Sequence, residues 1–169
     1  LSTGKNGLFT QTRIGRHGKP FKILKIRTMK DHPGLHTTAT TAHDPRITPL
    51  GRWLRRLKID ELPQLFNVLM GQMSFVGPRP DVPGFADQLQ GDDRILLSLR
   101  PGITGPATLA FRHEEELLAQ QEDPDTYNRE VIFPEKVRIN KEYLKNYSIF
   151  QDLRYILQTA IPKFNPYKK

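Results

Sequence analysis

The chain has 169 residues and no cysteine, and its 26 Lys and Arg outnumber 18 Asp and Glu to give a net charge of +8 at pH 7. This length suits one domain with its own core. The lack of cysteine excludes a disulfide framework and a cysteine-ligated zinc site. No apolar run approaches the roughly 20 residues that span a bilayer. Because the chain begins at Leu1 and shows no signal peptide, we expect it to be an excised fragment.

The positive charge is concentrated in the first third of the chain. Residues 1–59 contain 13 Lys and Arg and only two acids, whereas residues 60–169 contain 13 basic and 16 acidic residues. A block of this kind predicts an anionic partner such as phosphates, acidic lipid headgroups or nucleic acid. The alternative is a solvated face that only keeps the protein in solution.

A β-hairpin is predicted at the start of the chain, within residues 1–30. Residues 8–13 and 21–29 have strand character, and Gly15 to Gly18 are suited to the turn between them. Alternation puts Lys25 and Arg27 on one face of the second strand, roughly 7 Å apart. The two cations could hold a phosphate between them. They could equally be solvated cations at an exposed strand end.

A loop and an amphipathic helix follow. Residues 31–47 lack periodicity and are expected to form a loop, either a lid or a plain connection. Thr48 and Pro49 are suited to the N-cap and first position of a helix. An apolar stripe follows at helical spacing, with basic residues around it: Leu50, Trp53, Leu54 and Leu57. Such a helix can lie on a membrane surface or pack its stripe into the core.

Asp60 and Glu61 lie at the junction with a second apolar helix, which Gly71 is expected to end. A carboxylate beside cations can attack a phosphoryl group and form an acyl-phosphate. Its neighbour can hold the Mg²⁺ that such chemistry uses. The alternative is that one of the two acids caps the second helix, and from the residues alone the cap is the simpler interpretation.

The remainder is expected to be largely helical. Two prolines hold the backbone around Arg79, and an Arg held so rigidly usually has a partner. Ser148 and Gln151 match a capping box at the start of the last helix. Helices are expected near four ranges: 92–99, 113–121, 135–145 and 149–160.

These patterns together predict an α/β fold of the α+β type, mainly helical with a small N-terminal β-hairpin or sheet, in a single domain over residues 1–169. We expect the hairpin at 1–30 and the loop at 31–47. The catalytic helix pair and the Pro-Arg-Pro element follow at 48–80. The helical remainder covers 81–162, and 163–169 looks like a tail.

The chain resembles the bacterial sugar transferases, the monotopic phosphoglycosyl transferases that act on polyprenol phosphate. The match runs in order through nearly the whole chain. It rests on these segments: Phe9-Thr10-Gln11-Thr12-Arg13-Ile14-Gly15, Gly18-Lys19-Pro20-Phe21, Lys25-Ile26-Arg27-Thr28-Met29, Asp44-Pro45-Arg46-Ile47-Thr48, Leu54-Arg55-Arg56, Asp60-Glu61-Leu62-Pro63-Gln64-Leu65, Val76-Gly77-Pro78-Arg79-Pro80 and Arg100-Pro101-Gly102-Ile103-Thr104-Gly105.

The resemblance implies a two-step reaction. Asp60 would attack the β-phosphate of a UDP-sugar and release UMP, and polyprenol (undecaprenyl) phosphate would then take the phosphosugar from Asp60. Glu61 would bind Mg²⁺. Phosphate and nucleotide contacts would come from these residues: Lys25, Arg27, Arg55, Gln64, Arg79 (which would contact the uridine half of the donor) and Pro80. The product would initiate capsule, exopolysaccharide or O-antigen glycans.

The resemblance also implies a location at the cytoplasmic face of the bacterial inner membrane, with amphipathic helices at the membrane surface. Family members carry an apolar re-entrant helix before the first matched strand, and this chain lacks one. We therefore expect a catalytic domain cut free of its anchor, itself soluble or peripheral. It could be active alone or only a folded domain without the anchor. Sequence does not give the oligomeric state.

Departures from the family pattern put the identity of the sugar in doubt. They are Pro106 and Thr108, where the family usually has Trp and Gln, Asn140 in place of an Asp, and the acidic run from Glu114 to Glu116. A different class of function, a non-enzymatic module that binds nucleic acid, stays open because the first third is basic. The absence of an aromatic stacking platform and of a nucleic-acid motif disfavours it.

Overall fold

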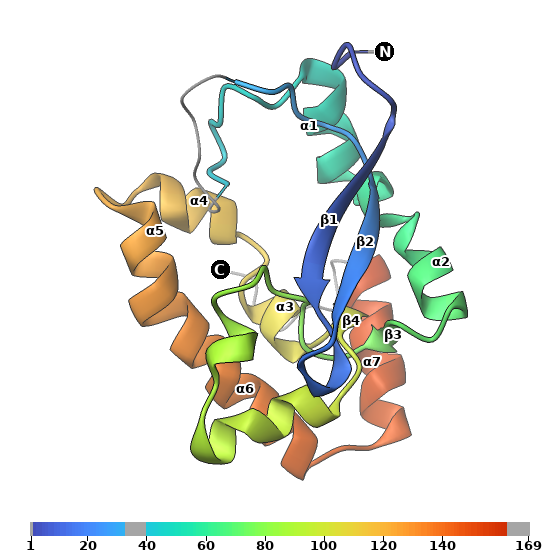
Figure 1. Cartoon of the computed structure of the whole chain (residues 1–169), viewed down its shortest axis with the longest axis vertical. Coiled ribbons are helices and arrows are strands. Elements are labelled where there is room, and N and C mark those ends of the chain that lie inside the picture. Colours follow the sequence, from blue (N-terminus) through green and yellow to red (C-terminus); the bar gives the residue numbers. More distant parts are fainter. Residues whose placement is uncertain (1, 33–39, 162–169) are drawn as a thin grey trace.

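The computed structural model describes residues 2–32 and 40–161, and it confirms an α+β arrangement in which helices predominate. A long hairpin crosses the middle of the molecule in Figure 1. Helices α1, α2 and α7 lie on one side of it, and α4, α5 and α6 lie on the other. The expected tail at 163–169 and part of the expected loop at 31–47 lie outside the described residues.

The predicted hairpin is confirmed. Strand β1 (Leu8–Ile14) pairs antiparallel with β2 (Pro20–Ile26), and Leu8 faces Ile26. A short 3-10 turn at Arg16–Gly18 connects them. The second strand ends at Ile26 rather than at Met29, because the chain then turns toward the next helix. The carbonyl of Thr28 accepts a hydrogen bond from the backbone N–H of Thr48 at 3.0 Å.

Helix α1 (Pro49–Arg56) begins as predicted, with the Thr48 hydroxyl accepting a hydrogen bond from the Gly51 N–H at 2.9 Å. Gly51 is required by the close approach of the helix to the hairpin. A Cβ at this position would lie 2.2 Å from the Thr28 carbonyl oxygen. The start of α1 is therefore fixed against the end of β2.

A tight junction separates α1 from the second helix. Lys58 takes the left-handed conformation at φ +57°, and residues Ile59–Glu61 form the short 3-10 turn η2. Helix α2 (Gln64–Leu69) follows, and Gly71 ends it at φ +72°, as predicted. The N-cap of α2 is Pro63, without a side-chain cap bond. The interpretation of Asp60 or Glu61 as the cap of this helix is therefore wrong.

One fully buried amide fixes α2 to the hairpin. The Asn67 side chain accepts from the Leu24 N–H at 3.0 Å and donates to the Lys22 carbonyl at 2.8 Å. It also donates to the Gln72 side-chain oxygen at 2.7 Å. Because buried polar groups are costly when unpaired, this network defines how α2 and β2 sit together.

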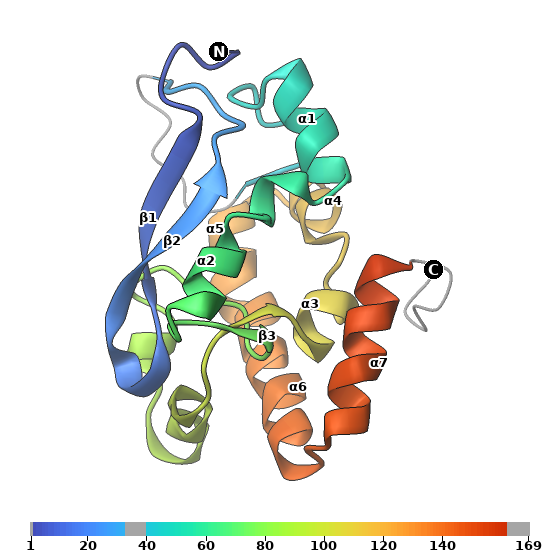
Figure 2. The same ribbon diagram turned by 90° about the vertical axis from the view of Figure 1, so that its right-hand side faces the viewer.

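The apolar side chains of α1 and α2 point outward. Leu50, Trp53 and Leu57 are each more than half exposed, so packing of this stripe into the core is not observed. Other exposed apolar residues come from α2, β3 and α7: Leu65, Phe66, Leu69, Phe75, Ile149, Phe150, Leu153 and Leu157. Figure 2 faces the side of the molecule that carries these elements. We call these residues, with the α1 stripe, the apolar face.

A second, parallel pair of strands lies beyond α2 and was not predicted. Strand β3 (Ser74–Val76) pairs with β4 (Gly102–Thr104). Both are only three residues long, and glycine and proline surround them. The sequence signal for a strand is weak in such surroundings. Between them lie the short 3-10 turn η3 (Ala86–Gln88) and the longer η4 (Gly91–Ser98), where a helix was expected.

The C-terminal half is helical, as predicted. It comprises these elements: α3 (Pro106–Ala110), α4 (Glu114–Ala119), α5 (Pro124–Tyr127), the π-helical turn η5 (Asn128–Ile132), α6 (Phe133–Lys145) and α7 (Ile149–Ala160). The Ser148 hydroxyl caps α7 by accepting from the Gln151 N–H at 3.2 Å, as the capping box predicts. Leu118 and Ile132 form a buried apolar cluster on which α4 and η5 meet.

Candidate active site

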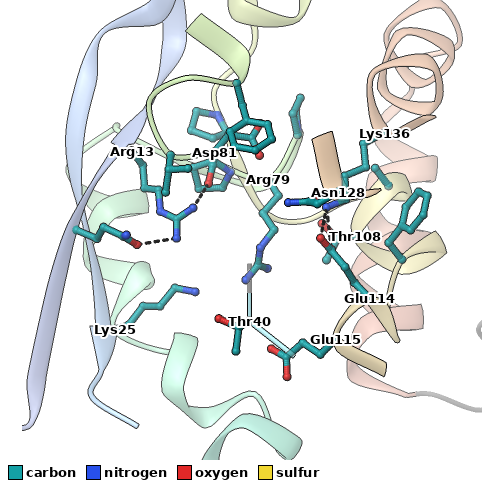
Figure 3. Close-up of a pocket in the computed structure, with 18 of the residues that line it drawn as sticks. Arg13, Lys25, Thr40, Arg79, Asp81, Thr108, Glu114, Glu115, Asn128 and Lys136 are labelled. Atoms are coloured by element: carbon teal, nitrogen blue, oxygen red, sulfur yellow. Dashed lines mark hydrogen bonds and ion pairs between the residues drawn. The ribbon is translucent and has the colours of Figure 1, made fainter. Parts of the chain in front are cut away.

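A cavity of about 690 Å³ opens between the hairpin and the C-terminal helices. Figure 3 shows Arg13 and Lys25 on one side of it and Thr108, Glu114, Asn128 and Lys136 on the other. We call the lining residues of the hairpin, and of α1 and η2 next to it, the hairpin wall: Arg13, Lys25, Arg55 and Asp60. The helical wall consists of Thr108, Glu114, Asn128, Lys136 and Asn140. Arg79, from the loop after β3, extends into the space between them (Figure 3).

Glu61 is the centre of a buried ion-pair cluster behind the hairpin wall. One of its oxygens, Oε1, accepts from Lys25 Nζ at 3.0 Å and from Arg79 NH2 at 2.6 Å. Burial alone would raise the pKa of Glu61, but the charges of Arg79 and Lys25 outweigh burial and lower it. Burial and the charge of Arg79 lower the pKa of Lys25 to about 8. Glu61 is therefore held ionised by two cations.

Asp60 has the opposite environment, although it is the next residue in the chain. Its side chain is buried, and its Oδ1 has no hydrogen-bond partner. Burial, followed by the charge of Glu61, raises the pKa of Asp60, while Lys25, Arg55 and Lys58 act against the shift. An unpaired carboxylate oxygen beside several cations is poorly solvated. It is therefore suited to attack an electrophile that carries negative charge.

The predicted clamp of Lys25 and Arg27 is not preformed. Lys25 binds Glu61, whereas Arg27 lies beyond the end of β2, donates to the Asn6 carbonyl at 2.9 Å and lies over the Phe9 ring at 5.2 Å. The two side chains line the same cavity but have different partners. The physical reason is that the strand ends between them, so the alternation that would align them does not continue.

Arg55 lines the cavity, as predicted, but it is engaged. Its guanidinium forms an ion pair with Glu115 of α4 and lies 3.9 Å from the Met29 sulfur. The acidic run that the sequence marked as unusual therefore reaches across the cavity. The neighbouring acid, Glu114, pairs with Lys136 at 2.7 Å.

Of the remaining predicted residues, Pro80 lines the cavity and Gln64 is elsewhere. The Pro80 carbonyl accepts from Arg13 NH1 at 3.1 Å. Gln64 is buried at the start of α2, and it is not among the described residues that line the cavity. A direct substrate contact from Gln64 therefore has no support in this geometry.

Sequence reasoning did not single out Arg13 and Asp81. Burial and the charge of Arg79 lower the pKa of Arg13 to about 10, and its Nε has no partner. Burial raises the pKa of Asp81 to about 6, against the charges of Lys136 and Arg13. The available signals were the inclusion of Arg13 in the first matched segment and the position of Asp81 directly after the Pro-Arg-Pro element.

The departures from the family pattern map to the helical wall. Thr108 on α3 and Asn140 on α6 both line the cavity, and Thr108 Oγ1 and Asn140 Oδ1 are buried without a partner. Pro106 occupies the first turn of α3, where a proline is tolerated. Thr108 and Asn140 therefore lie across the cavity from Asp60, whereas Pro106 is not among the described residues that line it.

The residues present fit a sparsely held divalent cation. No group of three or more Asp, Glu or His side chains converges among the described residues. Mg²⁺ in phosphoryl-transfer sites is usually held by one or two carboxylates together with substrate phosphates. Asp60 provides one such carboxylate in the cavity, and its Oδ1 has no partner in the protein. Glu61 is not among the described residues that line the cavity, and its Oε1 is held by Lys25 and Arg79.

No helix within the described ranges 2–32 and 40–161 is long and apolar enough to cross a bilayer.

The chain is similar to several curated proteins. It is 37% identical to the UDP-glucose:undecaprenyl-phosphate glucose-1-phosphate transferase of Escherichia coli K12 over 170 residues, which cover 97% of this chain and 34% of that protein. It is 33% identical to the galactosyl transferase CpsE of Streptococcus agalactiae over 92% of this chain and 34% of the relative. It is 32% identical to the exopolysaccharide production protein ExoY of Rhizobium meliloti, over 94% of this chain and 70% of the relative.

The chain thus spans about a third of the length of the first two relatives and more than two thirds of the third. The model of one family, described as bacterial sugar transferase, matches residues 1–165. The extent of this match, together with a carboxylate and cation site in the matched segments, shows that the chain belongs to the bacterial sugar transferase family.

Proposed function

We propose that this chain transfers a sugar-1-phosphate from a UDP-sugar to polyprenol (undecaprenyl) phosphate through a phosphosugar held covalently on Asp60. The observation that carries the proposal is the buried, unpaired Asp60 Oδ1 in a cavity that Lys25, Arg55 and Arg79 also line. The names of the relatives support it. The Escherichia coli protein is named for UDP-glucose and undecaprenyl phosphate, and ExoY is named for exopolysaccharide production.

The first step is an attack of Asp60 Oδ1 on the β-phosphorus of the donor. A bond forms between the carboxylate oxygen and phosphorus, the bond from phosphorus to the bridging oxygen breaks, and UMP leaves with the electron pair. Both reactants are anionic, so the cations of the site must offset their repulsion. Glu61 forms ion pairs with Lys25 and Arg79, so both cations are positioned before substrate arrives, and the charges of both interact with Asp60.

The second step regenerates the enzyme. A phosphate oxygen of the polyprenol phosphate attacks the phosphorus on Asp60, and the bond between phosphorus and the carboxylate oxygen breaks. The products are polyprenyl-diphosphosugar and free Asp60. Burial raises the pKa of Asp60, while the charges of Lys25, Arg55 and Lys58 oppose that shift. These cations therefore stabilise the carboxylate both when it attacks and when it leaves.

Glu61, with Asp60, would hold Mg²⁺, which when bound neutralises charge on the donor phosphates. In the ion-pair cluster Glu61 Oε1 already has two cationic partners. The role of Glu61 in our proposal is therefore double, because it orients Lys25 and Arg79 and offers its remaining oxygen to the metal ion.

We further propose that the apolar face contacts the membrane, at the cytoplasmic side of the bacterial inner membrane. Leu69 is 83% exposed and Phe150 is 80% exposed, and a soluble monomer rarely displays such large side chains together. The basic residues Arg52, Arg56 and Lys58 are also exposed and adjoin the apolar residues of α1. This composition is typical of helices that lie at an anionic lipid surface.

Covalent labelling tests the proposed nucleophile. The full-length protein is incubated with a panel of UDP-sugars, UMP release is measured, and intact-mass and peptide spectra are searched for a phosphosugar on Asp60. Asp60→Asn should lose the adduct and at least about 10³-fold of the UMP release. Asp92→Asn, at an exposed position on η4, is the matched control and should behave as the unmodified protein. An adduct that persists in Asp60→Asn would overturn the assignment.

Binding to lipid vesicles tests the membrane contact. Leu69→Gln should reduce partitioning to vesicles that contain anionic lipid by about tenfold or more, since it removes a large apolar contact without adding charge. Ile95→Gln, at a half-exposed position on η4, is the control and should have little effect. Equal partitioning of both variants would contradict a membrane contact through the apolar face.

A further inference from the structure

Four buried side-chain polar atoms lack a hydrogen-bond partner in the described part of the chain, and all four belong to residues that line one cavity. They are Arg13 Nε, Asp60 Oδ1, Thr108 Oγ1 and Asn140 Oδ1. Buried polar atoms in native proteins are almost always paired, so each exception calls for an explanation. Their concentration in a single cavity indicates that a bound ligand supplies the missing partners.

The four atoms divide by chemistry between the two walls. Arg13 and Asp60, on the hairpin wall, are charged groups, and they stand beside Lys25 and Arg79. Thr108 and Asn140, on the helical wall, are neutral. Their helices are α3 and α6, which pack against each other. Figure 3 shows Thr108 and Asn128 on one side of the cavity and Arg13 and Lys25 on the opposite side.

The neutral pair selects a particular kind of ligand group. Asn140 Oδ1 is an acceptor only, so it needs a ligand donor, and a phosphate ionised at neutral pH cannot provide one. Thr108 Oγ1 can donate or accept. A group with several hydroxyls satisfies both atoms at once. Uracil has a single N–H donor at its edge, and a polyprenyl chain has none. The ribose and the donor sugar both carry several hydroxyls, and the UMP measurement below separates these two.

The cavity is large enough for such a group. Its volume of about 690 Å³ lies within the range of small-molecule sites and far exceeds what one phosphate needs. Asn140 is only 5% exposed, so water has little access to its side chain from outside the cavity. A hydroxyl bound there would be recognised in a desolvated setting, where a missing hydrogen bond is most costly.

We infer that Thr108 and Asn140 form the subsite that binds the hydroxyl groups of the donor sugar and discriminates one UDP-sugar from another. The inference rests on the proposed function, because the sugar enters as part of a UDP-sugar whose phosphates lie near Asp60. It places sugar discrimination on the helical wall, across the cavity from the carboxylate that reacts.

The experiment removes the two polar atoms with little change in shape. Thr108→Val and Asn140→Leu are assayed for UMP release with several UDP-sugars that differ by one hydroxyl or its configuration. The ratio of kcat/KM for the best donor to that for its epimers should fall by about tenfold or more in each variant. Thr108→Ser, which keeps the hydroxyl, should retain the ratio of the unmodified protein. Thr12→Val removes a hydroxyl on the hairpin, away from the cavity lining, and should leave the ratio unchanged.

Two further measurements separate this role from its alternatives. Binding of UMP, which lacks the donor sugar, should be unchanged in both variants, and equal weakening of UMP and UDP-sugar would assign the wall to the nucleoside instead. Thermal unfolding should show equal or higher stability of Thr108→Val, because an unpaired polar atom has been removed. A purely structural hydrogen bond would give a lower Tm.

The outcomes also separate the subsite from the proposed function. If the unmodified protein releases UMP from no UDP-sugar, the proposed function fails, and the subsite with it. Suppose instead that the unmodified protein is active, and that Thr108→Val and Asn140→Leu fold correctly. If these two variants keep the ranking of donors of the unmodified protein, the subsite alone is overturned.

Discussion

On the hairpin wall the unpaired groups are charged, and on the helical wall they are neutral. Asp60 and Arg13 stand among further cations that Glu61 holds in place, whereas Thr108 and Asn140 offer a hydroxyl and an amide. Charge lowers the barrier to phosphoryl transfer without regard to the group that is transferred. Neutral donors and acceptors contribute little to that barrier but distinguish one hydroxyl pattern from another. On the proposed function, the cavity would thus separate reaction from recognition.

The largest effect that tests this division is expected from Arg79→Gln. The change removes a cation from the transition state and from Glu61, so kcat/KM for UMP release should fall by about 10²- to 10³-fold for every donor. Arg138→Gln, in an exposed ion pair with Glu135 on α6, is the control and should change it less than about twofold. A loss confined to one UDP-sugar would show that the hairpin wall also recognises the sugar.

A smaller effect is expected for stability, from Asp81→Asn. The pKa of Asp81 is raised to about 6 in the folded chain, against roughly 3.9 when unfolded. The folded state therefore binds the proton more tightly, and this contribution to stability is full below about pH 4 and is lost as the pH rises through 6.

Asp81→Asn should therefore raise the free energy of unfolding by roughly 1 to 3 kcal/mol at pH 7.5 and leave it nearly unchanged at pH 4. Urea unfolding at the two pH values measures both. Asp92→Asn, at an exposed position, should show no such difference. A gain of equal size at both pH values would exclude titration of Asp81 as its cause.

The smallest effect is expected from Glu115→Gln, which changes the ion pair between Arg55 and Glu115 across the cavity. On the proposed function, Glu115 would compete with a substrate phosphate for the Arg55 cation. Its neutralisation should lower KM for the UDP-sugar by about two- to fivefold, within the range of a partly exposed ion pair. Glu116→Gln, whose carboxylate faces His113 outside the cavity, is the control. An unchanged KM in Glu115→Gln would show that Arg55 does not meet the donor.

Sequence patterns predicted much of the fold, because the signals involved are local. The turn around Gly18, the Thr48 and Ser148 caps and the Gly71 stop each depend on neighbouring residues only. The parallel pair of β3 and β4 depends on contact between segments about 28 residues apart. Three-residue strands give no periodicity by which to predict such a pairing.

Only part of the candidate site could be predicted, because local signals reveal single residues but not the tertiary contacts between them. Asp60, Glu61 and the rigid Arg79 could be named from their local surroundings, but the pairing of Glu61 with both Lys25 and Arg79 is a tertiary contact. Sequence could mark Thr108 and Asn140 as departures from a pattern. It could not show that their polar atoms are buried in the same cavity, because burial depends on the packing of α3 and α6.

The size of helix α2 bears on the distance between Asp60 and a bilayer. It is six residues long, its Asn67 is fixed to the hairpin behind the cavity, and its Phe66 and Leu69 belong to the apolar face. A helix with its side chains is about 10 to 12 Å across. On the proposed membrane contact, the thickness of this one helix would therefore set how far Asp60, just before α2 in the chain, lies from the lipid that the apolar face touches.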